Sequence, residues 1–240
     1  MKFKKAVLLG AFFCWALIPG AHATERLFTY TYEPETMPRG ALEFEQWVTY
    51  LSMRWDLREE FEYGITDNYT LSLYLNEKTN ESEFEGVSIE NKWMVLDPAR
   101  NPVGLSLYLE PSIGNGEFEL EEKIILGQRF GPDKEWKWAF NAVHATEWED
   151  SQDPAKGTEV KGELEFDFGL TRELGKHWNL GVEFRNHNEI PEYDEWEHTA
   201  FFVGPVIAYH RENWWATFTF LDQLDKHELF NARLIAGVSF

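Results

Sequence analysis

The chain has 240 residues, a single cysteine and a formal net charge of −20, so it holds one large domain or at most two small ones. The acidic balance disfavours a nucleic-acid partner, because the phosphate backbone attracts basic surfaces. Beyond the first residues no apolar run is as long as a membrane helix, which argues against a helical membrane bundle.

The first 23 residues have the pattern of a secretory signal peptide. Three lysines precede an uncharged apolar run from Ala6 to Ile18. Ala21-His22-Ala23 then fits the small-x-small rule for cleavage. We therefore expect export and cleavage near Ala23, which would change the net charge to about −23 because only lysines are lost.

The only cysteine, Cys14, lies inside this apolar run. A lipoprotein signal needs a small residue before the cysteine, and Phe13 stands there. The mature chain would then have no thiol and no disulfide, so its stability must come from the fold itself.

Residues 24–38 precede the first alternating segment as an N-terminal lead. Phe28, Tyr30 and Tyr32 are spaced two residues apart within it. This lead could pack in the interior of a barrel and plug it from the periplasmic side, or extend as a flexible segment. The aromatic side chains favour ordered packing.

From Arg39 to the end of the chain, apolar and polar residues alternate with a period of two. Between Trp55 and Ile65, apolar side chains share one parity except at Glu59, and charged residues together with Gly64 fill the other. A period of two is typical of β-strands and would scatter the apolar residues around a helix. Alternation predicts about 12 strands, in the segments 39–51, 55–65, 69–76, 87–95, 103–110, 118–130, one starting at Trp136, 160–170, 178–185, 201–209, 214–221 and 230–240.

An even number of such strands predicts an all-β fold, a closed antiparallel up-and-down transmembrane β-barrel over residues 39–240. The expected connections differ in length, with short turns on one side and longer polar loops on the other, which places both termini in the periplasm. The expected outer connections near Ser52 and Leu224 are short too, which weakens this contrast. The compact turns are 66–68, 97–102, 131–135, 173–177 and 211–213, and the longer loops are 77–83, 148–157 and 190–197.

A soluble β-sandwich shows the same alternation, so further features must distinguish the two folds. The strands are long enough to cross a bilayer at a tilt. The last residue, Phe240, is in phase with the apolar stripe and is expected to act as a C-terminal signal for the barrel-assembly machinery. Aromatic residues begin several strands after compact turns and predict a girdle at the lipid headgroups, formed by Tyr69, Trp136, Trp178 and Trp214.

Several blocks resemble an uncharacterised family of bacterial outer-membrane, porin-like β-barrel proteins of unknown function. The resemblance covers most of the chain after the signal and implies a barrel in the outer membrane of a Gram-negative bacterium. It implies no established substrate and no catalytic residue. The blocks are Leu27–Tyr32, Met37–Gly40, Glu43–Thr49 (EFEQWVT), Glu60–Asp67 (EFEYGITD), Pro102–Gly114 (PVGLSLYLEPSIG) and Leu180–Glu189 (LGVEFRNHNE).

The polar parity of the strands would face the lumen, where acidic side chains outnumber basic ones. Acidic rings in a water-filled pore favour cations, so we expect passive or weakly cation-selective transport of small solutes. The alternative is a salt-bridged network that fills the narrow lumen and makes a closed structural or adhesion barrel, which acts through its outer loops. The candidate pore-lining residues are Glu43, Glu45, Arg58, Glu60, Glu62, Glu119, Glu121, Lys123, Arg129, Lys161, Glu163, Glu165, Asp167, Glu183 and Arg185.

Catalysis has little support in the sequence. His144, His198 and His210 lie on expected strands without a serine in an evident motif, so a lipid-modifying barrel enzyme is the weakest alternative. The acidic stretch 189–198 matches no calcium-loop spacing, and no metal or cofactor is expected. The expected partners are outer-membrane lipid, the assembly machinery, and small solutes or cations. The sequence does not specify the oligomeric state.

Overall fold

The computed structural model describes most of the chain after the predicted signal peptide. The signal peptide itself and its cleavage site near Ala23 lie outside the described residues. Parts of the connections expected at 77–83, 148–157 and 190–197 lie outside them as well. The described ranges are 26–51, 54–78, 83–114, 116–150, 157–193, 196, 198–224 and 230–240.

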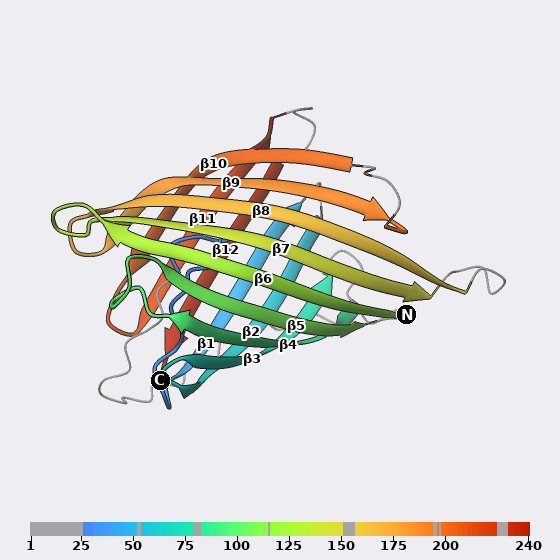
Figure 1. Ribbon diagram of the computed structural model, residues 1–240, viewed down its shortest axis with the longest axis horizontal. Helices are drawn as coiled ribbons and strands as arrows, with labels where there is room; N and C mark the ends of the chain where they lie inside the picture. The colour runs from blue at the N-terminus through green and yellow to red at the C-terminus, as the bar shows by residue number, and fades with distance from the viewer. Residues whose placement is uncertain are drawn as a thin grey trace, which may run out of the picture.

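The described chain forms one closed β-barrel, in which each strand pairs antiparallel with its neighbours in sequence (Figure 1). The first strand also pairs with the last, so the prediction of a closed antiparallel up-and-down barrel is confirmed. No helix in the described ranges is long and apolar enough to span a membrane. The strands are β1 (Leu42–Leu51), β2 (Arg54–Thr66), β3 (Tyr69–Lys78), β4 (Glu83–Leu96), β5 (Gly104–Gly114), β6 (Glu117–Phe130), β7 (Trp136–Asp150), β8 (Thr158–Leu174), β9 (Trp178–Pro191), β10 (His198–His210), β11 (Trp214–Gln223) and β12 (Phe230–Ser239).

Several strands extend beyond the segments that alternation predicts. β8 runs from Thr158 to Leu174, and β9 continues to Pro191 because its ladder with β8 continues after the apolar alternation ends. The expected contrast between compact turns and longer loops has an exception. The connection 97–103 at the terminal end is as long as 151–157 at the loop end. Apolar alternation stops where lipid contact stops, whereas backbone pairing continues into the polar ends.

The barrel closes where β1 meets β12. Their register runs from Glu43 opposite Ser239 to Leu51 opposite Asn231, and the backbone N–H of Phe240 donates to the carbonyl oxygen of Leu42 at 2.9 Å. Closure leaves no free sheet edge, which a bilayer requires because it offers no water to unpaired backbone groups. We call the end that holds Ala41 and Phe240 the terminal end, and the opposite end the loop end.

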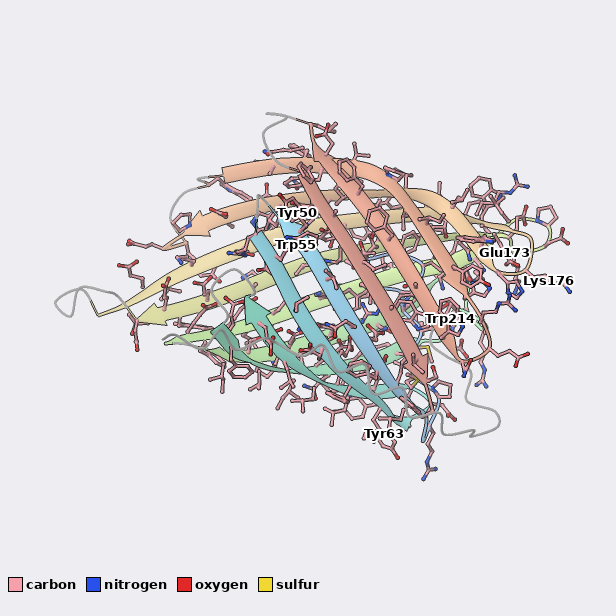
Figure 2. All side chains as sticks on the ribbon, turned by 180° about the vertical axis from the view of Figure 1, so that it is seen from behind. Tyr50, Trp55, Tyr63, Glu173, Lys176 and Trp214 are labelled. Atoms are coloured by element: carbon pink, nitrogen blue, oxygen red, sulfur yellow. The ribbon has the colours of Figure 1, made fainter. Side chains whose placement is uncertain are left out.

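The outward face of the barrel is apolar and carries aromatic side chains at both ends (Figure 2). At the loop end the rings of Tyr50 and Trp55 lie 4.7 Å apart. At the terminal end the ring of Tyr209 lies 4.6 Å from Trp178 and 5.2 Å from Trp214. The four predicted girdle residues each begin a strand at the terminal end, and they are Tyr69, Trp136, Trp178 and Trp214.

Candidate functional site

Residues 26–38, the N-terminal segment, lie inside the barrel and pack against its inward face (Figure 1). Phe28 is fully buried, and its ring occupies the space that a side chain at Gly169 of β8 would need. Pro34 lies close to Gly127 of β6, where an added Cβ atom would be 2.8 Å from the proline ring. These glycines therefore provide the room in which the segment packs.

Glu183 of β9 is the main anchor of the N-terminal segment. Its fully buried carboxylate accepts the backbone N–H groups of Thr29, Tyr30 and Thr31 at 3.1, 2.9 and 2.9 Å. The hydroxyl group of Thr29 donates to the same carboxylate at 3.2 Å, and that of Thr219 on β11 donates as well. Three successive N–H groups that converge on one anion form a backbone nest, which stabilises the negative charge.

Further polar contacts hold the rest of the segment to the barrel wall. The Asn141 side chain accepts from the backbone N–H of Tyr32 at 2.6 Å and donates to its carbonyl oxygen at 2.9 Å. The backbone N–H of Met37 donates to Thr70 Oγ1 at 2.9 Å. These bonds supply partners to backbone groups that would otherwise be buried without them.

Two acidic residues of the segment lie beside Lys137 of β7. Glu35 forms an ion pair with the Lys137 ammonium group. Glu33 accepts the backbone N–H of Leu27 at 3.0 Å, and burial raises the pKa of its carboxyl group to about 7. The segment therefore carries a carboxyl group that changes charge near neutral pH.

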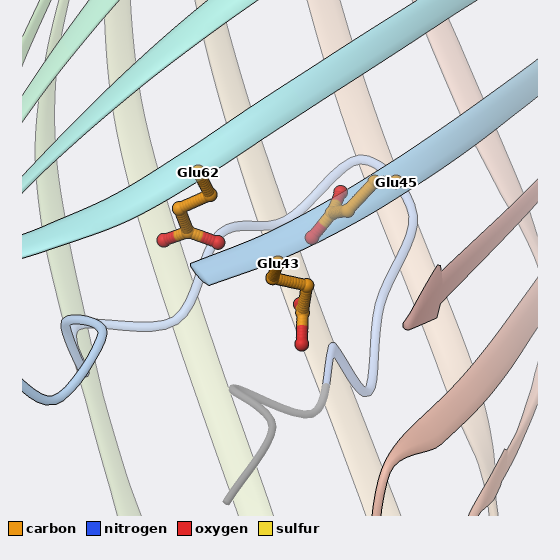
Figure 3. Close-up of side chains that lie close together, drawn as sticks. All are labelled: Glu43, Glu45 and Glu62. Carbon is orange, nitrogen blue, oxygen red and sulfur yellow. The ribbon is translucent and has the colours of Figure 1, made fainter. Parts of the chain in front are cut away.

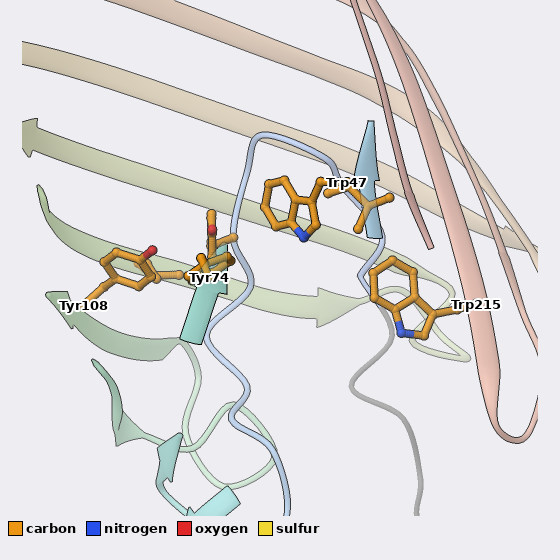
Figure 4. Packing of buried hydrophobic residues seen from close by; sticks show 7 residues of the cluster. Trp47, Tyr74, Tyr108 and Trp215 are labelled. Atoms are coloured by element: carbon orange, nitrogen blue, oxygen red, sulfur yellow. The ribbon is translucent and has the colours of Figure 1, made fainter. Parts of the chain in front are cut away.

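An aromatic layer packs beside the N-terminal segment (Figure 4). Trp47, Tyr74 and Tyr108 project from β1, β3 and β5, and Tyr32 joins them from the segment. The rings of Tyr32 and Tyr108 lie 5.3 Å apart, and those of Trp47 and Tyr74 lie 6.2 Å apart. The Arg58 guanidinium lies 3.5 Å from the centre of the Tyr74 ring, which places a cation over the aromatic face. Trp47 also lines the cavity at the loop end, so the layer adjoins that cavity.

A cavity of about 420 Å³ opens above this layer at the loop end. Arg58 and Arg233 reach it from the layer, and Arg58 forms an ion pair with Glu110. Glu119 lies mainly among other acids, namely Glu110, Glu121 and Glu163. The charged side chains that line the cavity are Arg54, Asp56, Arg58, Glu85, Glu110, Glu117, Glu119, Glu121 and Arg233, so acids predominate there.

The predicted pore-lining residues occupy several different places in the barrel. Arg58, Glu119 and Glu121 line the cavity. Lys123 lies over the ring of Tyr32 in the aromatic layer, at 4.0 Å from its centre. Those fully or almost fully buried in the filled half are Glu43, Glu45, Glu60, Glu62, Asp167 and Glu183.

The remaining predicted pore-lining residues pair with charges of the barrel wall. Glu165 of β8 binds both Arg185 and His187 of β9, and Glu163 lies 4.0 Å from the same histidine. Arg129 lies at the terminal end, 3.8 Å from Glu173, and Lys161 lies at the loop end near Glu147 and Glu149, at 3.0 and 2.8 Å. The structure therefore does not bring Arg129 and Lys161 together with the others.

The inward aromatic residues were not predicted from the sequence. Trp47 has the parity of Glu43 and Glu45, and Tyr74 has the parity of Ser72. A large aromatic residue on the polar parity of a barrel strand is the signal that could have revealed the layer. Arg26, whose guanidinium lies over the rings of Tyr32 and Trp47 at 4.4 and 4.7 Å, had no such signal.

Solved structures with a similar fold are bacterial porins and channels. The NanC porin aligns with a TM-score of 0.59 and 11% identity over 82% of this chain and 98% of that chain. The KdgM porin gives a TM-score of 0.59 and 8% identity, with 82% and 99% covered. The COG4313 outer membrane channel from Pseudomonas putida F1 gives 0.61 and 10%, with 89% and 100% covered. At these identities the likeness shows a porin-like outer-membrane barrel fold.

A comparison with curated proteins finds no match. Residues 20–229 match the sequence profile of a family of unknown function (DUF6662), which covers most of the chain. The chain therefore belongs to the family DUF6662, and its described residues form a closed barrel of 12 strands with a porin-like fold.

Proposed function

We propose that the protein is an outer-membrane channel for small solutes, with a preference for cations, whose lumen is closed by its own N-terminal segment. The terminal end would face the periplasm, and the cavity at the loop end would be the external entrance. The porin-like fold and the acidic lining of the cavity support this function.

The observation that carries the proposal is the polarity of the wall behind the N-terminal segment. Glu183, Asn141 and Thr70 hold the segment through its backbone, and all three side chains would bind water equally well if the segment left. The segment is therefore held largely by hydrogen bonds that water can replace, and not by apolar contact alone. Removal of the segment would therefore leave a hydrated passage below the cavity.

A reversible crosslink between the segment and the wall tests this closure. The hydroxyl groups of Thr29 and Thr219 donate to the same carboxylate, so these two side chains are neighbours. The mature chain is expected to have no thiol of its own, so two cysteines introduced at these positions could form a disulfide only with each other. In planar bilayers the T29C/T219C variant should lose its current on oxidation and regain it with a reductant, while T29C alone should not respond.

Deletion of residues 24–37 is the complementary experiment, with thermal unfolding as the check that the barrel still folds. The deletion variant should conduct more than the wild type. Absence of current at every salt concentration, in both proteins, would exclude a channel and favour the closed structural barrel.

Cation preference is tested at the cavity. The E119Q/E121Q variant should move the reversal potential in a salt gradient toward zero, because it removes two acids from the lining. E147Q, at an acid beside Lys161 outside the cavity lining, is the matched control. An unchanged reversal potential in the double variant would exclude these two acids as the origin of selectivity.

Three features support the proposed localisation in the outer membrane, and each can be tested: the cleavage site near Ala23, Phe240 and the aromatic girdle. Cleavage near Ala23 is tested by sequencing the N-terminus of the mature protein. Replacement of Phe240 with serine should lower the amount of barrel in the outer membrane if the assembly machinery reads this residue. Replacement of a girdle residue with leucine should weaken its contact with the lipid headgroups. The measurement is the partitioning of each variant between bilayers of different thickness. The residues to replace are Tyr69, Trp136, Trp178 and Trp214.

A further inference from the structure

Four carboxylates meet inside the terminal end of the barrel, on β1 and β2. The register places Glu43 opposite Glu62 and Glu45 opposite Glu60. Carboxylate oxygens of Glu43, Glu45 and Glu62 all lie within 4.8 Å of one another (Figure 3). Four acidic side chains therefore occupy adjacent inward positions of two paired strands.

These carboxylates are buried and have little compensating charge. Glu43, Glu45 and Glu60 are 0% exposed and Glu62 is 5% exposed. Among the described residues, Arg26 is the one cation within ion-pair distance, at 3.2 Å from Glu45 and 3.4 Å from Glu60. Buried like charges at this separation are unfavourable unless a cation or protons neutralise them.

A separate observation on β3 points to a ligand at this place. Ser72 lies directly opposite Glu62 in the register and shares its inward face. Its side chain is 1% exposed, and its hydroxyl group has no hydrogen-bond partner. Glu60 Oε1 is also buried without a partner. Buried polar atoms without partners are rare and indicate an ion or water between them.

We propose that Glu43, Glu45 and Glu62 bind a divalent cation, Ca²⁺, with Ser72 and Glu60 supplying further oxygen atoms. All the available donors are oxygens, which hard cations prefer, whereas zinc and copper favour nitrogen and sulfur. The site is buried and irregular. Mg²⁺ demands an octahedral shell and retains several waters, so the flexible coordination of Ca²⁺ fits better.

Indole groups orient two of the proposed ligands. Trp215 Nε1 donates to Glu43 Oε1 at 3.0 Å, and Trp47 Nε1 donates to Glu45 Oε2 at 2.9 Å. Ser239 of β12 donates to the second oxygen of Glu43. Such outer hydrogen bonds fix the orientation of ligand carboxylates at metal sites. The ion would therefore connect β1 and β2 with the closing strand β12.

The two indoles also provide the experiment. Terbium replaces calcium at oxygen sites, and excitation of a nearby tryptophan sensitises its luminescence. Wild-type barrel stripped with a chelator should show sensitised terbium emission that Ca²⁺ displaces and Mg²⁺ displaces poorly. E62Q removes a ligand and should abolish this emission, whereas E173Q, at a partly exposed acid of the same end, should retain it.

A second variant and a second measurement guard against misfolding. S72A retains the carboxylates and should weaken terbium binding by about tenfold or more. Ca²⁺ should raise the thermal unfolding temperature of the wild type and have no effect on E62Q. If wild-type barrel shows neither sensitised emission nor stabilisation by Ca²⁺, the carboxylates share protons instead and the proposal is wrong. These results do not depend on conduction, so they stand apart from the proposed channel function.

Discussion

Replacement of Glu183 with glutamine should release the N-terminal segment while the barrel stays intact. The carboxylate accepts three backbone N–H groups, of Thr29, Tyr30 and Thr31. A hydrogen bond to a charged acceptor contributes about 1.5–3 kcal/mol, and a neutral one about 1 kcal/mol. Loss of the charge therefore costs about 1 kcal/mol per bond, or about 3 kcal/mol for the three. This corresponds to a roughly hundredfold shift toward the released segment.

Hydrogen exchange measures this shift at the amides that Glu183 binds. In E183Q the exchange of the amides of Thr29, Tyr30 and Thr31 should accelerate by about a hundredfold, while amides in the strand ladders stay protected. E163Q changes an inward acid of β8 that forms no hydrogen bond or ion pair with residues 26–38 in the described part of the chain, and it serves as the control. If E183Q exchanges within about threefold of the wild type, the carboxylate does not anchor the segment.

Three further predictions concern the same segment. G169V introduces a side chain into the space of the Phe28 ring and should displace the ring from its buried position, which costs about 2 kcal/mol. The displaced segment should then be cut by a protease, and a segment that stays uncut would contradict this prediction. N141L leaves both backbone groups of Tyr32 buried without partners and should lower the free energy of unfolding in urea by about 2–5 kcal/mol; a loss below about 1 kcal/mol would show that the segment repacks. Burial raises the pKa of the Glu33 carboxyl group from 4.5 to about 7, so between these pH values the packed segment keeps a proton on Glu33 that the released segment loses. The packed segment is therefore most stable below pH 4.5. Its stability should fall as pH rises through this range, and an E33Q variant whose exchange keeps the same pH dependence would refute the assignment.

The sequence predicted the fold well because the two faces of every strand lie in different environments. Lipid selects apolar residues on one parity and the filled lumen selects polar ones on the other, so segments such as 55–65 show their period directly. The ends of β8 and β9 were not predictable in this way. Past the bilayer both faces are polar, and the ladder that continues there depends on the partner strand.

The state of the lumen was harder to predict. The charges of Arg58 and Arg185 were placed inward, but their pairing with Glu110 and Glu165 depends on distances between strands. The anchor at Glu183 involves backbone groups of Thr29, which have no residue-specific signature in a sequence. The packed and extended alternatives for residues 24–38 therefore stayed open until the three-dimensional contacts were known.

The position of the N-terminal segment has a consequence for how the barrel closes. β1 and β12 must find each other across almost the whole chain, and such a long loop is slow to close because its entropy is lost before any contact forms. The segment is joined directly to β1, yet it binds Glu183 of β9, and its Arg26 carbonyl oxygen accepts from the Thr217 hydroxyl group of β11. Once the segment is bound to these strands, β1 is already held near the closing edge. The same residues that occupy the lumen would thus shorten the final search in folding.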